Sequence, residues 1–569
     1  MTAEARRWNH NIHVARFALE ERCRVAVPAS ARYGRACRPP DRGAAVAASS
    51  TYSIWGWGEA GSEPRQDELE AFGPNVETLL GFPAQAPERP LPPPPLPAPR
   101  VAAPRALLPV ASDEPLDRAR HGLGRSYRDL VRGLRGHIDH PPDLVLRPRD
   151  EAELAAALEW AGQAGVALVP FGGGTSVVGG VEPAVGDAFA GVASLDLGGM
   201  AGVAEVDPVA RAARIRAGTL GPRAEEELGR HGLTLRFYPQ SFERSTVGGW
   251  LATRAAGHFS TRATHVDDLV ESVRMLTPAG VYESRRLPGS GAGPSPDRLV
   301  LGSEGTLGVI TEAWLRVQPR PAERASATVA FGSFAAGAAA VRGLVQAGLA
   351  PAACRLVDAA EATMTGTLAG GDAALVLGFE SVGVPVGQDL ARALELCAEG
   401  GGRPLGDGGG GAGGAWRASF VRAPYLRDRL VLLGVLVETF ETAATWDRLD
   451  GLVDGVGETV REALARICGG GVVTCRLTHV YPDGAAPYFT VLAPARRGSE
   501  LAQWAEVKAA AAEAVLAAGG TITHHHAVGR DHRPWYDRQR PEPFALALRA
   551  AKQVLDPAGV LNPGVLLDA

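Results

Sequence analysis

Lysine is almost absent from this chain of 569 residues, because Lys508 and Lys552 are its only two lysines. The formal net charge is −5 at pH 7, so the composition provides no excess of positive charge for a nucleic-acid backbone. Hydrophobic residues make up 46% and charged residues 21%, which is ordinary for an enzyme with a packed core. We therefore expect a globular protein that acts on small molecules and binds no nucleic acid.

Cysteine is also scarce and follows no motif. No Cys-x-x-Cys pair occurs, which argues against both a zinc site and a redox dithiol. Cysteines at wide and irregular spacing favour a reducing compartment. The six residues are Cys23, Cys37, Cys354, Cys397, Cys468 and Cys475.

Long apolar runs are missing as well. No window of about 20 residues is apolar enough to cross a bilayer, and the first residues lack the basic start, apolar run and cleavage site of a secretory signal. The expected location is therefore the cytoplasm, with a peripheral contact at a membrane left open. The sequence does not define an oligomeric state, and a homodimer is also left open.

The N-terminal quarter is irregular in composition. Residues 1–50 are rich in Arg and Ala without a helical or strand period, so we expect a disordered extension or an over-extended start. Residues 51–140 are expected to form an N-terminal segment with a proline-rich linker and a helix. They hold the aromatic segment YSIWGWG, which a solvated tail would not need, and then the proline run PERPLPPPPLPAP. That run is typical of a stiff linker, with a ligand for an SH3-type domain as the alternative.

A folded α+β region begins at about Pro141. PDLVLRP predicts a short strand, Asp150 can cap the helix EAELAAALEWAGQAG, and VALVPF predicts a buried strand. Further along, ATVAFGSF and AALVLGFES predict new strands that alternate with helices, and KQVLDPAGVLNPG predicts a helix followed by a turn.

These patterns divide the folded region into three parts. We assign residues 141–320 to a first domain, 321–545 to a second α+β domain, and 546–569 to a helical segment that returns to the first. Within the second domain Gly400–Gly414 is expected to be a flexible surface insertion. No Gly-Lys-Ser/Thr follows it, so it is not a nucleotide phosphate loop.

Three segments of the first domain have the composition of backbone that contacts a ligand. Phe171–Ser176 places three glycines and two hydroxyl residues directly after a strand, where inward N–H groups suit a pyrophosphate. Gln240–Gly257 gathers small and hydroxyl residues that suit a planar ring or a diphosphate, and Leu299–Ala313 is a glycine-punctuated turn leading into a strand. Each segment alone is compatible with an ordinary turn, whereas the three in this order are specific.

In this order the segments resemble the FAD domain of the vanillyl-alcohol-oxidase, or PCMH-type, flavoprotein family, from about Pro141 to the C-terminus. Within that family the chain is most similar to the alkyldihydroxyacetonephosphate (alkylglycerone-phosphate) synthases, in WGWG, STVGGWLATRAAG, GSEGTLGVITEA, ETFETAATWD, TCRLTHVYPDGAAPYF and THHHAVG. The resemblance implies an α+β fold with a PCMH-type domain of two α+β subdomains, a cap or substrate domain, and non-covalently bound FAD. It assigns the cofactor contacts to Pro170, Phe171, Gly172, Gly173, Gly174, Thr175, Ser176, Gln240, Ser241, Ser245, Thr246, Gly249, Thr253, Ala256, His265, Glu304, Gly305, Gly308, Val309 and Ile310.

The resemblance also implies a reaction and the arginines that serve it. Synthases of this family exchange the acyl chain of acyl-dihydroxyacetone phosphate for a long-chain alcohol, with no net transfer of electrons. Arg427 in PYLRD and Arg355 in PAACRLVD match arginines that the family needs, and a planar guanidinium suits the substrate's phosphate. The residues alone leave ion pairs open, of Arg427 with Asp428 or Asp447 and of Arg355 at the surface.

The remaining candidates are a tyrosine and a histidine triplet. Tyr488 in GAAPYF matches the family's acid/base tyrosine, which needs a positive neighbour to act as a base, although such a tyrosine is otherwise mostly core. His524, His525 and His526 match a triplet that lines the flavin site. The run TIT before them predicts a strand, with His525 facing opposite to its two neighbours. Such a strand cannot bring all three to one metal, and with no cysteine or carboxylate nearby we predict no metal site.

The sequence departs from the family close to the flavin. Ala263, Thr264 and His265 stand where animal synthases carry a Tyr-Gly-Asn type of sequence. His265 is therefore either an additional base or a substituted contact.

Two other functions stay open at this point. One is an FAD-linked oxidoreductase that oxidises a D-2-hydroxy acid or a similar alcohol, for which the C-terminal DPAGVLNPG is equally typical. The other is a non-catalytic flavin-binding protein, in which Arg427, Tyr488 and His526 would be exposed or scattered.

Overall fold

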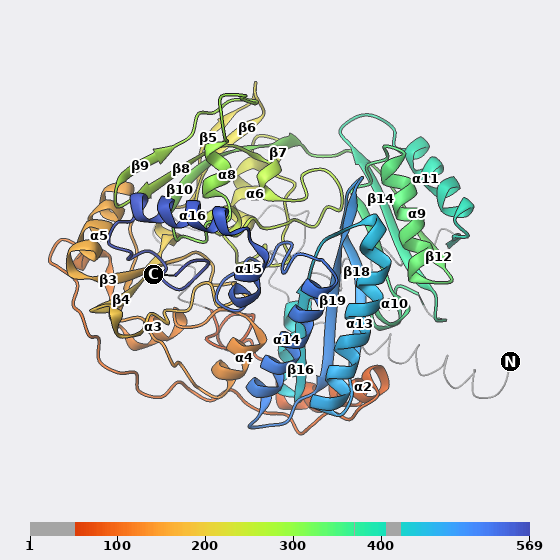
Figure 1. The fold of residues 1–569 in the computed structure, drawn as a ribbon, viewed down its shortest axis with the longest axis horizontal. Helices are drawn as coiled ribbons and strands as arrows, with labels where there is room; N and C mark the ends of the chain where they lie inside the picture. The colour runs from red at the N-terminus through yellow and green to blue at the C-terminus, as the bar shows by residue number, and fades with distance from the viewer. Residues whose placement is uncertain (1–51, 369, 406–422, 569) are drawn as a thin grey trace.

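The computed structural model describes residues 52–368, 370–405 and 423–568. The expectation of disorder for residues 1–50 and the greater part of Gly400–Gly414 lie outside the described residues. Figure 1 shows two regions side by side, one built on small sheets and the other on one large sheet. Helices and mixed sheets together confirm the predicted α+β class.

The first region contains two sheets. A four-stranded sheet has the order β1-β2-β4-β3, with β4 parallel to both β2 and β3. A five-stranded antiparallel sheet has the order β5-β6-β10-β8-β9, and β7 pairs with β11 beside it. The strands are β1 Ala111–Ser112, β2 Leu144–Leu146, β3 Val166–Phe171, β4 Gly191–Asp196, β5 Val203–Asp207, β6 Ala212–Arg216, β7 Leu233–Thr234, β8 Val270–Thr277, β9 Gly280–Glu283, β10 Val309–Arg316 and β11 Gln318–Pro319.

The second region is an antiparallel sheet in the order β15-β12-β14-β13-β18-β19-β16, with β17 paired to β19. Its strands are β12 Glu323–Phe331, β13 Ala353–Val357, β14 Ala373–Ser381, β15 Arg403–Leu405, β16 Val435–Glu441, β17 Ala444–Thr445, β18 Val472–Val480 and β19 Gly484–Pro494. Strand β15 includes part of the predicted glycine-rich insertion. The prediction of a flexible loop is wrong for these residues, because they pair with β12 at the edge of the sheet.

Helices cover both regions. In Figure 1, α9 and α11 pack beside β12 and β14, whereas α13 and α14 lie along β16, β18 and β19. The helices are α2 Gln66–Leu80, α3 Pro115–Arg120, α4 Tyr127–Leu134, α5 Glu151–Ala164, α6 Gly221–Gly229, α7 Val247–Thr253, α8 Pro296–Val300, α9 Phe334–Gln346, α10 Ala359–Met364, α11 Gly387–Glu399, α13 Trp446–Cys468, α14 Glu500–Ala517, α15 Arg533–Gln539 and α16 Glu542–Leu555. No helix among the described residues is long and apolar enough to span a bilayer.

Local sequence explains several of these elements. Asp150 accepts a hydrogen bond from the N–H of Glu153 and so caps α5, as predicted. The predicted strands VALVPF and AALVLGFES form β3 and β14, with mostly buried side chains. Trp55 and Trp57 of the aromatic segment are 4% and 5% exposed, which confirms that it is not a solvated tail.

The C-terminal segment lies against the first region. The N–H of Leu168 in β3 donates to the carbonyl of Val560 at 2.8 Å, and the N–H of Asn562 donates back to Leu168 at 2.8 Å. Figure 1 shows the end of the chain next to β3 and β4, after α16 has crossed the first region. The chain end therefore completes the surroundings of the glycine loop that follows β3.

Candidate functional site

The glycine loop after β3 has the free donors that a pyrophosphate needs. The backbone N–H groups of Gly172, Gly173, Gly174 and Thr175 donate to no acceptor in the described part of the chain. The hydroxyl oxygen of Ser176, by contrast, accepts two N–H groups of the next turn, at 3.4 and 2.9 Å. Hydrogen bonds thus hold the end of the loop in place, while the N–H groups at its centre can bind an anion.

Close packing explains why this loop is made of glycine. A Cβ atom on Gly172 would lie 2.3 Å from Thr246 Oγ1, and one on Gly173 would lie 1.6 Å from the carbonyl oxygen of Arg244. Gly174 has a φ of +65°, which other residues rarely adopt. The first and second predicted segments are therefore in direct contact.

The third segment lies against the first. A Cβ atom on Gly305 would be 2.8 Å from Pro170 Cγ. The buried carboxylate of Glu304 accepts the N–H groups of Val528 at 2.9 Å and Gly529 at 2.8 Å. Burial raises the pKa of Glu304 to about 7, against the effect of these two donors. Glu304 thus joins the predicted cofactor segment to the chain that follows the histidine triplet.

Several predicted contact residues use their hydroxyls within the second segment. Ser245 donates to the carbonyl of Ser241 at 2.9 Å. Thr246 accepts from the N–H of Gly249 at 3.2 Å and caps α7, while Thr253 donates to the carbonyl of Gly249 at 2.8 Å. These bonds shape the segment, so the hydroxyls are not simply free for a cofactor.

The other predicted contacts lie at the ends of elements. Ala256 pairs with His265 through an isolated bridge. Val309 and Ile310 open β10, and their side chains are 1% and 5% exposed in the core. Phe171 ends β3, and Gln240 and Gly308 lie in the turns before α7 and β10.

The three consecutive histidines curl around one buried carboxylate. Glu441, the last residue of β16, accepts the N–H groups of His524, His525 and His526 and the hydroxyl of Thr523. The predicted strand with alternating faces is therefore wrong, because the triplet forms bends. Backbone donors that a strand would offer to a neighbouring strand turn inward to Glu441 instead.

Glu441 remains ionised at neutral pH. Burial alone would raise the pKa of this carboxyl group, but His526 and His524 in their protonated forms, the hydroxyl of Thr523 and the backbone donors hold it well below its usual range. When the rings are neutral, the hydroxyl and the three N–H groups still stabilise the carboxylate. A charged acceptor at the end of β16 thus fixes the course of the histidine loop.

The same carboxylate is also a possible metal ligand. Two groups of three side chains each offer ligand atoms within 4.8 Å of one another, and they are Glu441, His525 and His526, and His479, His524 and His525. The premise that no carboxylate lies near the triplet was wrong. Both nitrogens of His479 are engaged within the protein, Nδ1 at 3.1 Å from Thr478 Oγ1 and Nε2 at 2.9 Å from the carbonyl oxygen of Gly257. The absence of a metal stays a prediction.

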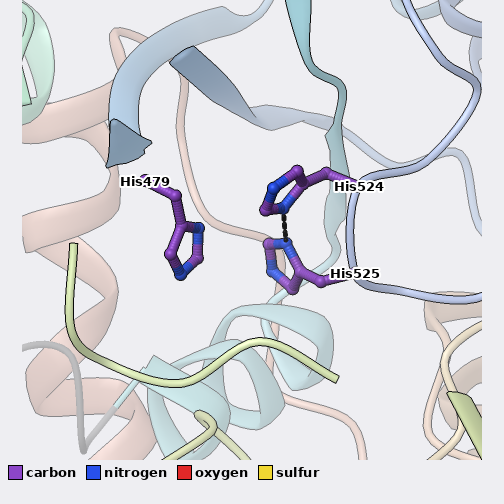
Figure 2. Close-up of side chains that lie close together, drawn as sticks. All are labelled: His479, His524 and His525. Carbon is purple, nitrogen blue, oxygen red and sulfur yellow. Dashed lines mark hydrogen bonds between the residues drawn. The ribbon is translucent and has the colours of Figure 1, made fainter. Parts of the chain in front are cut away.

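A chain of imidazole rings runs from the loop to the protein surface. His265 Nδ1 lies 3.1 Å from the carbonyl oxygen of Arg254, and His265 Nε2 lies 3.1 Å from His524 Nε2. His524 Nδ1 is 3.0 Å from His525 Nδ1, the contact drawn in Figure 2. The hydroxyl of Tyr481 lies 2.8 Å from His524 Nε2. Each ring therefore constrains which nitrogen of the next ring carries a proton.

The histidines of this cluster are neutral at physiological pH. Burial lowers the pKa of each ring below its usual 6.5, and for most of them the charges of neighbouring histidines lower it further. The rings are His265, His479, His524, His525 and His526. In Figure 2, His479 stands opposite the paired rings of His524 and His525.

Tyr488 faces the histidine loop from β19. Its side chain is 5% exposed, and its ring centre lies 6.1 Å from that of His525 and 5.6 Å from that of His526. Burial raises the pKa of Tyr488, and the guanidinium of Arg476 opposes that effect. Arg476 is itself paired with Glu361 at 2.7 Å. The tyrosine thus has the positive neighbour that proton transfer requires.

Arg355 belongs to the same buried region. It lies in β13 and is 1% exposed, so the alternative of a surface ion pair is wrong. Its guanidinium donates to the carbonyl of Thr478 at 3.2 Å and to that of His258. Burial and the charge of Arg476 lower the pKa of Arg355 to about 9, and Arg355 in turn helps to lower the pKa of His479.

Arg427 lies elsewhere, in the helical residues 423–432. Its Nη1 donates to the carbonyl oxygen of Arg125 at 2.8 Å. Its positive charge lowers the pKa of the buried Asp428 carboxyl group, against the effect of burial. Its contacts among the described residues are thus to Arg125 and Asp428 and not to the histidines. The structure brings Tyr488, Arg355 and the triplet together and sets Arg427 apart.

Four residues of the cluster were not predicted, namely Glu441, His479, Tyr481 and Arg476. All of them lie in ETFETAATWD and TCRLTHVYPDGAAPYF, the two segments that carried the family resemblance. A charged residue at the end of the apolar strand VLVETFE was the available signal for Glu441, because a buried charge requires partners.

Known proteins resemble the chain over most of its length. The family described as "FAD binding domain" matches residues 142–284, and "FAD linked oxidases, C-terminal domain" matches residues 320–566. Alkyldihydroxyacetonephosphate synthase of Trypanosoma brucei brucei is 30% identical over 79% of this chain and 77% of its own. The Caenorhabditis elegans enzyme of that name is 30% identical over 80% and 81%. A solved alkyldihydroxyacetonephosphate synthase superposes with a TM-score of 0.74 at 25% identity, covering 90% of this chain and 99% of that one.

These likenesses identify the cofactor, and the geometry fits it. The chain uses FAD, as predicted. The unengaged N–H groups of the glycine loop and its contact with the second segment suit the pyrophosphate of FAD.

Proposed function

Because the chain belongs to the alkyldihydroxyacetonephosphate synthase family, we propose that it exchanges the acyl chain of acyl-dihydroxyacetone phosphate for a long-chain alcohol. The observation that carries the proposal is the buried cluster in which Tyr488, Arg476 and the histidine loop meet. Residues 141–320, with residues 546–569, would hold FAD, and residues 321–545 would supply most of the substrate site.

The exchange sets clear demands on protons. The bond between the substrate carbon and the acyl oxygen breaks, the fatty acid leaves as a carboxylate, and the alcohol loses its proton as the ether bond forms. FAD, when bound, supplies the electron-poor ring against which the substrate carbon reacts. Tyr488 supplies a hydroxyl proton at that carbon. A neutral histidine of the loop takes a proton from the same carbon or from the alcohol.

The arginine cluster around Arg427 supports a role in holding the substrate's phosphate. Arg427 Nε is buried and has no acceptor in the described part of the chain. The positive charges of Arg125 and Arg244 also lower the pKa of the Asp428 carboxyl group, against the effect of its burial. Burial and the charge of Arg244 lower the pKa of Arg125 to about 10, as expected where positive charge is in excess. A phosphate would relieve that excess and give Arg427 its missing partner.

Arg355 has a different role in this proposal. Its guanidinium donates to two backbone carbonyls at the edge of the histidine cluster, those of Thr478 and His258. We assign it to positioning His479 and to keeping the cluster's histidines unprotonated, with no direct contact to phosphate.

A lipid substrate also requires an approach to a membrane. Helix α16 carries three large apolar side chains in solvent, Phe544 at 51%, Leu546 at 55% and Val554 at 69% exposure. Such side chains suit a peripheral contact with a bilayer, and self-association as a homodimer is the competing use. Co-sedimentation with phosphatidylcholine vesicles, compared with the variant Phe544→Ser, distinguishes the two when combined with size-exclusion chromatography.

The activity itself is tested with purified protein loaded with FAD. Acyl-dihydroxyacetone phosphate and deuterated hexadecanol are supplied, and the products are separated by mass spectrometry. We expect deuterated alkyl-dihydroxyacetone phosphate together with one equivalent of free fatty acid. Absence of the ether product, with flavin reduction by a D-2-hydroxy acid in a parallel sample, would instead identify an FAD-linked oxidoreductase.

A further inference from the structure

The proton positions in the ring chain follow from one backbone carbonyl. The oxygen of Arg254 can only accept, so His265 carries its proton on Nδ1, which lies 3.1 Å away. A neutral His265 then has a lone pair on Nε2. That lone pair points at His524 Nε2, 3.1 Å away, so His524 must carry its proton on Nε2.

The proton of His525 is fixed in the same way. With its proton on Nε2, a neutral His524 has a lone pair on Nδ1. This nitrogen lies 3.0 Å from His525 Nδ1, so His525 donates from Nδ1. The other nitrogen of His525, Nε2, is then left with a lone pair, and it makes no hydrogen bond within the described part of the chain.

Tyr481 offers a competing arrangement. Its hydroxyl lies 2.8 Å from His524 Nε2 and 3.3 Å from Thr264 Oγ1. If Tyr481 donated to His524, the proton of His524 would lie on Nδ1, and His525 would carry its own proton on Nε2. His265 opposes this state, because two lone pairs would then face each other at 3.1 Å. With His265 in place, the single Nε2 proton of His524 is shared between His265 Nε2 and the hydroxyl oxygen of Tyr481, and Tyr481 donates its own proton to Thr264.

We propose that His265 is a positioning residue that sets the tautomer of His525 through His524, so that His525 presents an unprotonated Nε2 to the substrate. His265 thereby determines whether His525 begins the reaction as a base or as a hydrogen-bond donor. Burial lowers the pKa of all three rings, which keeps each of them neutral so that a single tautomer is defined. The catalytic use of His525 rests on the proposed function, whereas the tautomer does not.

The chain also gives the reaction a route for a proton. When His525 Nε2 takes a proton, His525 can pass its Nδ1 proton to His524 Nδ1. His524 in turn passes its Nε2 proton to His265 Nε2. His525 and His524 are then neutral again, and His265 carries a proton on both ring nitrogens. His265 is the member of this chain beside exposed Arg254, so an excess proton would reach solvent at that end.

The test is ¹⁵N NMR of the FAD-loaded protein with ring-labelled histidine, in which protonated and unprotonated ring nitrogens have distinct shifts. The signals of His525 are assigned from their loss in His525→Gln. We expect the Nδ1–H form of His525 in the native protein and in Tyr481→Phe, which removes the competing donor. We expect the Nε2–H form in His265→Phe, where Tyr481 is free to donate to His524.

Activity gives the second readout. His265→Phe should lower kcat by roughly 100-fold, the scale of a lost general base, and His265→Gln should restore part of it, since its amide oxygen can accept from His524. An Nε2–H form of His525 in the native protein, or an unchanged tautomer in His265→Phe, would overturn the proposal. If the tautomers are as expected but the protein forms no ether product, the role of His265 is supported and only the proposed function is rejected.

Discussion

Arg476 lies over the ring of Tyr488, with its guanidinium carbon 4.0 Å from the ring centre. Burial makes ionisation of this phenol costly, and the guanidinium offsets part of that cost. A phenol held in this way can give up a proton to a reacting carbon and recover it. We therefore regard the pair, and not the tyrosine alone, as the acid/base unit.

The first prediction concerns that unit. Tyr488→Phe keeps the buried ring but removes the hydroxyl, so kcat should fall by about 100-fold or more. FAD content should be unchanged, and the free energy of unfolding should fall by only about 1 kcal/mol. Steady-state assays and chemical denaturation measure the two effects. Activity within about twofold of the native value would remove Tyr488 from the proton transfer.

The second prediction concerns the carboxylate inside the histidine loop. Glu441→Gln replaces one acceptor oxygen by an amide that cannot accept from the backbone N–H groups, which should cost about 1–3 kcal/mol. Hydrogen–deuterium exchange at residues 521–527 should rise sharply. Glu438→Gln is the matched control, because Glu438 is buried in the same strand but bonds to Trp504 and Lys508. Similar exchange at residues 521–527 in both variants would contradict the role of Glu441.

The third prediction tests the glycine loop. In Gly173→Ala the new methyl group would overlap the carbonyl oxygen of Arg244, 1.6 Å away. To relieve this overlap the loop has to shift from the geometry that would bind the pyrophosphate, and restoring that geometry in the complex costs about 1–3 kcal/mol. FAD affinity should therefore fall by roughly tenfold or more. Gly289→Ala is the control, because a Cβ atom there meets nothing within 4 Å. Equal FAD affinity of both variants, measured by flavin fluorescence, would argue against a pyrophosphate site in this loop.

The fourth prediction separates the two arginines. Arg427→Ala should raise KM for acyl-dihydroxyacetone phosphate by about 10- to 100-fold, the range for a lost charged hydrogen bond, and leave KM for the alcohol unchanged. Arg324→Ala, at an arginine whose side chain is 68% exposed, serves as the control. A raised KM for both substrates would indicate a structural defect and not a lost phosphate contact.

The fifth prediction is a pH dependence of stability. His532 is 3% exposed, and burial with the charge of Lys508 lowers its pKa to about 3 from the ordinary 6.5. Below pH 6.5 the unfolded chain binds a proton at this position and the folded chain does not, so stability falls with decreasing pH. His532→Asn keeps a donor for the carbonyl of Ala527 and removes the titration.

Native protein should therefore lose stability relative to His532→Asn as the pH falls from about 6.5 toward 3, by up to about 1.4 kcal/mol per pH unit. Urea denaturation at a series of pH values measures the difference. Parallel curves for the two proteins across this range would show that His532 titrates normally in the folded state.

Sequence patterns predicted the elements that are determined by residues close together in the chain. The cap at Asp150, the buried strand Val166–Phe171 and the turn into Val309–Arg316 follow from residues within one element or its ends. The family resemblance then led to FAD and to Tyr488 with the triplet. Neither source could show that Arg355 is buried, because the carbonyl groups it binds belong to segments distant in sequence, those of Thr478 and His258.

The histidine loop shows most clearly where local reasoning ends. The run Thr521–Ile522–Thr523 favours a strand by its β-branched residues, yet Glu441 lies more than 80 positions earlier in the chain and draws three successive N–H groups to itself. Satisfying one buried charge outweighs the strand preference of a few residues. Contacts of that separation could not be read from one sequence.

The most direct test of the account is an anaerobic experiment that follows product and flavin in one cuvette. Protein with bound FAD receives acyl-dihydroxyacetone phosphate and an excess of hexadecanol, while absorbance reports the flavin and mass spectrometry counts the ether product. We expect many molecules of alkyl-dihydroxyacetone phosphate per flavin, with the flavin oxidised at the end. Product that never exceeds the flavin, or flavin that ends reduced, would contradict an exchange without net electron transfer.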